Sequence, residues 1–130
     1  MSREIKFRAW DIKNKRFVNI VRLILDQFGA LDYADVVFKG KIYKLYSSDI
    51  VLEQDTGIED KNGKRIREGD IMRYDAIDYQ ILWSDYYASF ETKRINSKFF
   101  NEGLTLHFLA RVGRVIGNIH ENPELLGSEE

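Results

Sequence analysis

The stretch of residues 60–74 most strongly constrains how this chain can fold, because it brings two tight turns close together. Within it, Asn62 and Gly63 lie between two lysines. Both residue types tolerate the positive φ angles that a two-residue type I′ hairpin turn requires. We therefore predict a hairpin tip over residues 60–65, with Asn62 and Gly63 at its centre.

A second turn is predicted at Gly69, which lies between Glu68 and Asp70. Glycine adopts positive φ angles without steric cost, and the Asp70 carboxylate can accept a hydrogen bond from nearby backbone. Two neighbouring carboxylates can also perform acid–base chemistry when one of them is buried. Because this pair flanks a turn glycine, we favour a structural role. A strand is then predicted from Ile71 onward.

Most of the chain shows strand patterns. Apolar and polar residues alternate with a period of two in residues 5–10 and 77–83, as expected for strands with one buried face. The alternating stretch 5–10 is followed by a second predicted strand over residues 16–20. Together they predict a β-hairpin over residues 4–21. Further short strands are predicted at residues 41–46, 50–52, 71–74, 86–91, 104–108 and 114–119.

The region of residues 22–50 is the least determined by its pattern. Residues 21–28 favour a strand followed by a turn at Gly29, whereas residues 31–38 fit either a helix or a strand. Near the other end, Asn122 and Pro123 are predicted to stop the last strand, because proline cannot donate to a strand ladder.

The composition suits a small protein of the cell interior. The 130 residues are 44% hydrophobic and contain no cysteine, so disulfides and thiolate metal sites are excluded. The first residues contain no apolar signal core, and the longest uncharged run is far too short to span a membrane. The net charge is −1, although residues 1–22 carry a local charge of +5. We expect a soluble protein without a global attraction for nucleic acid.

Three blocks of the sequence resemble the YopX family of bacteriophage and prophage proteins. They are Ile5-Lys-Phe-Arg-Ala-Trp-Asp11, then Thr56-Gly-Ile-Glu-Asp-Lys-Asn-Gly63 running into Glu68-Gly-Asp-Ile71, and finally Ile116-Gly-Asn-Ile-His-Glu-Asn-Pro-Glu-Leu-Leu126. They lie in the family's order across nearly the whole chain. His120 departs from the tyrosine expected in the last block.

The resemblance implies a mainly β protein. It implies a small N-terminal β-hairpin region over residues 1–55 and an SH3-like β-barrel over residues 56–126. The last residues, 127–130, are expected from their terminal position to form a disordered tail. The resemblance also implies a phage or prophage origin and the cytoplasm of a bacterial host. It implies no particular activity, cofactor or catalytic residue.

No catalytic constellation is recognisable in the sequence. It lacks a nucleophile elbow, a phosphate-binding loop and a dinucleotide fingerprint. Its two histidines, His107 and His120, do not make a metal site without a third ligand. His107 is expected on the solvated face of a strand, and the polar residues around His120 are expected to organise the final turn. We therefore expect no enzyme activity, no cofactor and no metal.

The first functional hypothesis is a non-enzymatic module that binds a protein partner or itself, forming a homo-oligomer. Small β-domains present edge strands and aromatic surfaces that suit such contacts. The aromatic residues expected to form the surface are Tyr79, Trp83, Tyr86 and Tyr87.

The alternative hypothesis is nucleic-acid binding by the basic N-terminal hairpin. Cations with a stacking ring on one strand face suit a single strand. The acidic second half of the chain argues against it. The expected contacts are Lys6, Arg8, Trp10, Lys13, Lys15 and Arg16.

Overall fold

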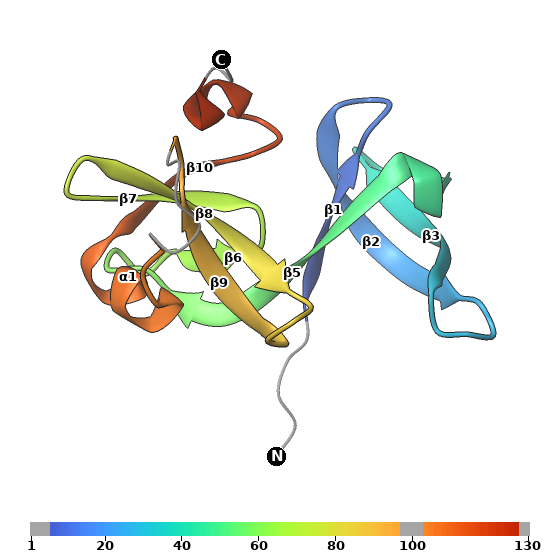
Figure 1. The fold of residues 1–130 in the computed structure, drawn as a ribbon. Coiled ribbons are helices and arrows are strands. Elements are labelled where there is room, and N and C mark those ends of the chain that lie inside the picture. Colours follow the sequence, from blue (N-terminus) through green and yellow to red (C-terminus); the bar gives the residue numbers. More distant parts are fainter. Residues whose placement is uncertain (1–5, 97–102, 128–130) are drawn as a thin grey trace. The chain divides into compact units, whose positions relative to one another are not determined.

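A computed structural model describes residues 6–96 and 103–127, and this part of the chain is mainly β (Figure 1). The chain divides into two compact units between Gln54 and Asp55. This division lies one residue before the boundary expected from the sequence. We call residues 6–54 the N-terminal unit and the described residues from 55 onward the C-terminal unit, and describe each separately.

The N-terminal unit is an antiparallel sheet with the strand order β4-β3-β2-β1-β5. Its elements are β1 (Phe7–Asp11), β2 (Arg16–Leu25), β3 (Leu31–Phe38), β4 (Lys41–Tyr46), the 3-10 helix η1 (Ser47–Asp49) and β5 (Ile50–Glu59). The predicted first hairpin is confirmed as β1 and β2, and residues 31–38 are a strand. β5 pairs with β1 through its first half and continues into the C-terminal unit.

The apolar residues of alternate strand positions form the core of the N-terminal unit. Its buried members are Ala9, Val18, Ala34, Val36, Leu45 and Ile50. The connection between β3 and β4 is a two-residue turn, in which Lys39 and Gly40 have φ angles of 50° and 80°. Such mirror-image turns match the twist of the flanking strands, so the hairpin closes without splaying.

The C-terminal unit contains a four-stranded antiparallel sheet with the order β10-β7-β8-β9. Its elements are β6 (Arg65–Arg67), β7 (Asp70–Tyr74), β8 (Ile77–Ser84), β9 (Ser89–Arg94), the helix α1 (Leu106–Val112), β10 (Arg114–Asn118) and the 3-10 helix η2 (Pro123–Leu126). β6 pairs with the second half of β5. Among the described residues, β10 and β9 are the two edges of the four-stranded sheet and do not pair with each other, so a closed barrel is not formed.

The first turn of the central stretch differs from the prediction. Gly63 has a φ angle of 83°, but Asn62 does not have a positive φ angle, so this is not a type I′ turn. The Gly63 amide donates to the Asp60 carbonyl oxygen over 3.0 Å. The Asp60 carboxylate also accepts bonds from the Asn62 and Lys64 amides. These bonds favour a type I turn followed by a glycine bulge.

The second turn is confirmed at Gly69, whose φ angle is 89°. The Asp70 carboxylate accepts a hydrogen bond from the Arg67 amide over 2.8 Å, as the sequence predicted. The Gly69 amide donates to the Ile81 carbonyl oxygen, and its carbonyl oxygen accepts from the Ile119 amide. The turn thereby joins β8 to the segment that follows β10.

The strand predicted at residues 104–108 is wrong, because this segment enters the helix α1. Thr105 caps the helix by accepting a hydrogen bond from the Phe108 amide. Leu106, Leu109 and Ala110 then fall on one buried face, with the spacing of a helix. Residues 85–88 are also a turn, so the strand predicted from residue 86 begins only at Ser89.

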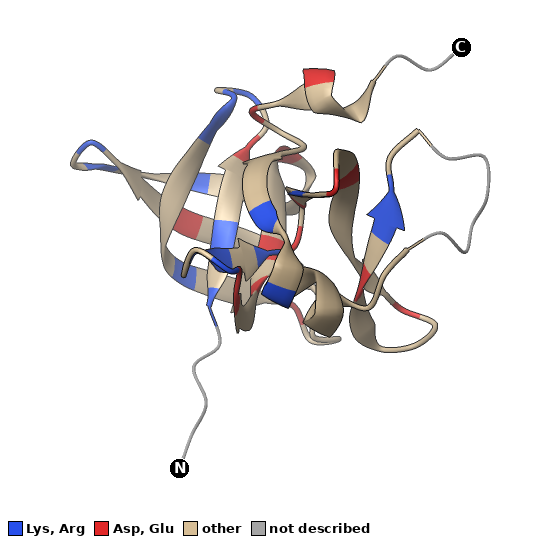
Figure 2. Cartoon of the chain, turned by 90° about the vertical axis from the view of Figure 1, so that its left-hand side faces the viewer, with Lys and Arg blue, Asp and Glu red and all other residues tan. Residues whose placement is uncertain are grey.

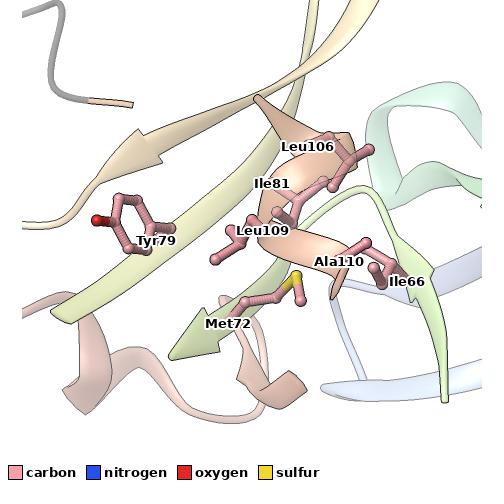
Figure 3. Packing of buried hydrophobic residues seen from close by; sticks show 7 residues of the cluster. All are labelled: Ile66, Met72, Tyr79, Ile81, Leu106, Leu109 and Ala110. Atoms are coloured by element: carbon pink, nitrogen blue, oxygen red, sulfur yellow. The ribbon is translucent and has the colours of Figure 1, made fainter. Parts of the chain in front are cut away.

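The helix completes the core of the C-terminal unit. Figure 3 shows the side chains of α1 directed toward those of the neighbouring strands. The buried cluster consists of Ile66, Met72, Tyr79, Ile81, Leu106, Leu109 and Ala110. Of the tail predicted to be disordered, residues 128–130 lie outside the described residues.

Candidate protein-interaction surface

The turn end of the β8–β9 hairpin carries four aromatic rings. Trp83 and Phe90 are cross-strand partners, and their ring centroids lie 5.0 Å apart in an edge-to-face arrangement. Tyr86 and Tyr87 form a second edge-to-face pair at 4.7 Å. Trp83 is 41% exposed, Tyr86 86% and Tyr87 69%. We call these four residues the aromatic end.

Local hydrogen bonds shape the aromatic end. The Trp83 indole Nε1 donates to Asp85 Oδ1 over 3.0 Å, and the Tyr87 amide donates to Ser84 Oγ over 3.1 Å. Ala88 closes the turn with a φ angle of 53°. These contacts hold the turn that presents the two tyrosines.

A groove of about 440 Å³ runs beside the aromatic end. Its walls come from residues 87 and 89–92 on one side and from residues 103–106 on the other. The Thr92 hydroxyl donates to the Leu104 carbonyl oxygen, which links the two walls of the groove. A Cβ atom at Gly103 would lie 2.1 Å from the Thr92 carbonyl oxygen, so only glycine allows this close approach.

One of the four residues expected on this surface is not there. Tyr79 is only 5% exposed and belongs to the core of the C-terminal unit. It shares a strand face with Ile81, and both belong to the buried cluster that includes residues of α1, whereas Trp83 lies outside this cluster. Phe90 was missed, although its position mirrors that of Trp83 across the turn. The sequence signal that could have found it is its position in the strand after the turn, where it pairs with Trp83 across the hairpin.

The basic residues of the N-terminal hairpin do not form a continuous exposed stripe. Arg8 Nε lies 2.9 Å from Glu53 Oε1, and both side chains are largely buried. Trp10 is buried and packs edge-to-face on Phe17 at 4.8 Å. Its ring therefore lacks the exposed face that base stacking needs. Figure 2 shows basic and acidic segments interspersed along the strands.

The remaining cations of the hairpin differ in their exposure. Lys6 and Lys15 are exposed. Lys13 is also exposed and lies 3.9 Å from Asp49. Arg16 instead packs its guanidinium group over the Phe38 ring at 3.9 Å.

Arg16 belongs to a polar cluster with Asp11 and Tyr43. The Tyr43 hydroxyl donates to Asp11 Oδ2 over 2.5 Å and accepts from Arg16 Nη2 over 3.3 Å. Burial alone raises the pKa of Asp11, but bonds from Asn14 and Tyr43 and the charge of Arg16 outweigh it, so the pKa is lowered. Burial and the bond to Asp11 raise the pKa of Tyr43. The cluster links β1, β2 and β4 and has a structural role.

The other polar residues considered for chemistry lie on the helix α1 or organise the final turn. His107 lies on the exposed side of α1, not on a strand. The buried Asn118 side chain accepts bonds from the His120 and Glu121 amides, and Asn122 Oδ1 accepts from the Asn118 amide. Among the described residues, no three acidic or histidine side chains form a group that could hold a metal ion.

Comparison with known proteins agrees with the three sequence blocks. The model of the YopX protein family matches residues 6–127 of the chain. The chain belongs to the YopX family. No curated protein matches it significantly. Protein EF1440 from Enterococcus faecalis, a crystal structure, is similar with a TM-score of 0.65 and 32% sequence identity, over 96% of this chain and 99% of that one.

The blocks that mark this YopX protein coincide with turns that the structure holds by side-chain bonds. The middle block contains the Asp60 and Asp70 turns, and the last block contains the Asn118 turn. The aromatic end lies outside all three blocks. In the described part of the chain, no helix is long and apolar enough to cross a membrane.

Proposed function

We propose that this YopX protein is a non-enzymatic module that binds a protein partner through the aromatic end and the adjoining groove. The observation that carries the proposal is the exposure of Trp83, Tyr86 and Tyr87 beside a groove. Tyrosine and tryptophan are enriched at protein interfaces, where they supply much of the binding energy. An exposed pair of tyrosines contributes little to folding, which favours a role in recognition.

The groove gives this surface a shape suited to an extended segment. Its volume lies in the range of sites that hold several side chains. β9 is an edge strand of its sheet, so a segment lying in the groove would run along this edge, beside the stretch where Gly103 and Leu104 approach Thr92. The proposal includes the bacterial cytoplasm as the setting, as the phage resemblance of the sequence implies.

Two further parts of the proposal concern fold and self-association. Four antiparallel strands, with β10 returning to pair with β7 after a helical segment, support an SH3-like relationship for the C-terminal unit. The partner is either another protein or a second copy of the chain. Sedimentation velocity distinguishes the two cases, because a strict monomer at high concentration would exclude a second copy as the partner.

The binding test uses the full chain and a displayed library of extended peptides. The tightest peptide is then measured by fluorescence anisotropy against the chain and a Tyr86→Ser/Tyr87→Ser variant. We expect the double substitution to weaken binding about 30-fold, the effect of one interface hot spot. Phe28→Ser is the control, since Phe28 is 85% exposed on a different turn.

The control is expected to bind like the unmodified chain. The proposal fails if no library peptide binds, or if the double substitution leaves the affinity of every selected peptide unchanged.

Nucleic acid is the second candidate, supported by one contact. Arg16 and Lys39 lie over the same Phe38 ring, at 3.9 and 5.5 Å, so cations from the β1–β2 and β3–β4 turns gather there. Anisotropy with labelled single- and double-stranded oligonucleotides tests it. Micromolar binding that weakens steeply with salt, and is lost in Lys13→Ala/Lys15→Ala, would favour it.

A further inference from the structure

β4 leaves one side of its backbone open. It is the outermost strand in the order β4-β3-β2-β1-β5 and pairs with β3 alone among the described strands. An open strand edge is a template on which another strand can pair, unless side chains prevent it. The properties of this edge therefore decide what can bind there.

The hairpin geometry shows which backbone groups face the open side. Phe38 and Lys41 flank the two-residue turn and are register partners. Residues that flank such a turn form a hydrogen-bonded pair, and bonded and non-bonded pairs alternate along an antiparallel ladder. The backbone N–H groups of Ile42, Lys44 and Tyr46 therefore point toward the open edge. The carbonyl groups of Ile42 and Lys44 point the same way.

The same three residues present their side chains on the exposed face of the sheet. Ile42 is 67% exposed and Tyr46 is 54% exposed, and Lys44 is exposed between them. The edge thus offers an apolar, a cationic and an aromatic side chain at alternate positions. An added strand would set its own alternate side chains against these three.

The charge of this edge is not balanced by neighbouring carboxylates. Lys39, Lys41 and Lys44 all lie on β4 or its turn, and none has an ion-pair partner within the described chain. Asp35 is the cross-strand neighbour of Lys44, but its Oδ2 lies 2.6 Å from Arg22 Nε. The Lys44 ammonium group lies over the Tyr33 ring instead, at 4.1 Å.

We propose that the β4 edge accepts an extended acidic segment of a partner protein as an added strand. A carboxylate of the segment lies opposite Lys44, and apolar side chains lie opposite Ile42 and Tyr46. The backbone bonds supply affinity, and the alternating side chains supply selectivity. This surface shares no residue with the aromatic end, and the proposal does not depend on it.

A second copy of the chain fits this edge less well. In an antiparallel β4–β4 contact centred on Lys44, the two Lys44 side chains would oppose each other directly. Centred on Tyr43, the contact would set Ile42 against a lysine twice, and either contact brings the lysines of both copies together. Like charges opposed across strands are unfavourable, whereas an acidic segment neutralises the edge.

The test uses the full chain and a short fluorescein-labelled peptide with valine, glutamate and tyrosine at alternate positions and threonine between them. Anisotropy should give a dissociation constant of about 10–100 μM. A peptide with lysine in place of glutamate should bind at least about tenfold more weakly. The variant Lys44→Glu should reverse this preference, while Lys93→Glu, an exposed lysine of β9, should leave it unchanged.

Methylation of the peptide amides provides a measurement that needs no variant protein. Methyl groups on the amides that face β4 should abolish binding, and those on the opposite amides should leave it intact. The proposal is overturned if both peptides bind equally, if neither binds, or if methylation on either side has the same effect. It is also overturned if sedimentation velocity shows a dimer of the chain to which the acidic peptide does not bind. A further contradicting result would be an oligonucleotide, rather than the acidic peptide, that binds in a Lys44-dependent way.

Discussion

The Asp60 carboxylate gives the sharpest test of how the central stretch stabilises the C-terminal unit. It is buried and accepts three hydrogen bonds from backbone amides: Asn62 at 2.8 Å, Lys64 at 2.9 Å and Val115 at 2.8 Å. The first two bonds shape the turn, and the third joins the turn to β10. The informative changes are Asp60→Ala, which removes both acceptor oxygens and so all three bonds, and Asp60→Asn, which replaces one carboxylate oxygen with a donor.

The expected loss follows from the surroundings of each amide. The two turn amides reach water in Asp60→Ala, so each lost bond costs about 0.5 kcal/mol, whereas the partly buried Val115 amide loses a charged acceptor at a cost of about 2 kcal/mol. We expect the free energy of unfolding to fall by about 3 kcal/mol in Asp60→Ala. For Asp60→Asn, which keeps one oxygen acceptor, we expect about 2 kcal/mol.

The effect should depend on pH in a defined direction. Burial raises the pKa of Asp60, but the bonds from Val115, Lys64 and Asn62 outweigh it, so the pKa in the folded chain lies below its ordinary value. A lowered folded-state pKa contributes stability that is complete above the unfolded-state pKa of about 4 and is lost as pH falls through the folded-state pKa. The difference between the chain and Asp60→Asn should therefore shrink at low pH.

The assay is urea unfolding followed by tryptophan fluorescence. The two tryptophans lie in different units, so a Trp10→Phe background leaves Trp83 to report on the C-terminal unit alone. Glu59→Gln is the control, because Glu59 is the exposed neighbouring carboxylate and should change stability by less than about 0.5 kcal/mol. The reasoning is refuted if Asp60→Ala behaves like this control, or if its cost is the same at pH 7 and at about pH 2.

Three further substitutions test other contacts by the same urea assay. Ala76→Gly should raise the free energy of unfolding by about 1 kcal/mol, because Ala76 has a φ angle of 64° in the β7–β8 turn and pays a steric cost that glycine avoids; an unchanged midpoint would contradict this. Gly103→Ala should destabilise the C-terminal unit by about 1–3 kcal/mol, since its Cβ would collide with the Thr92 backbone; wild-type stability would show that this approach is not tight. Tyr43→Phe should cost about 1–2 kcal/mol through loss of its bonds to Asp11 and Arg16. This last loss should appear in Trp10 fluorescence in a Trp83→Phe background, and its appearance in Trp83 fluorescence instead would argue against separate reporting by the two units.

Local patterns were sufficient wherever one turn or one strand face decides the structure. The alternation of residues 77–83 predicted β8, and Gly69 with Asp70 predicted the second turn. In both cases the cause is contained in neighbouring residues: a period of two, a positive φ angle, or a carboxylate beside the amide that it accepts from.

The candidate site was predictable only in part. The sequence pointed to an aromatic surface that included Trp83, Tyr86 and Tyr87, but a period of two could not show where the core ends along β8. Tyr79 and Trp83 share a strand face, but only the first of them is buried in the cluster that includes residues of the helix α1. The basic hairpin shows the same limitation, because the sequence does not reveal that Glu53 of β5 lies opposite Arg8.

The sequence by itself determined the mainly β class, the YopX family and the positions of the main turns, because these depend on residues close together in the chain or on motifs in a set order. Tertiary structure alone decided that residues 106–112 are a helix and that Trp10 is buried. Alternation in residues 104–108 favoured a strand, but Leu106, Leu109 and Ala110 bury more completely against Ile81 and Met72 as one helical face. Such choices depend on surfaces supplied by distant segments, and burial against those surfaces outweighs a short local pattern.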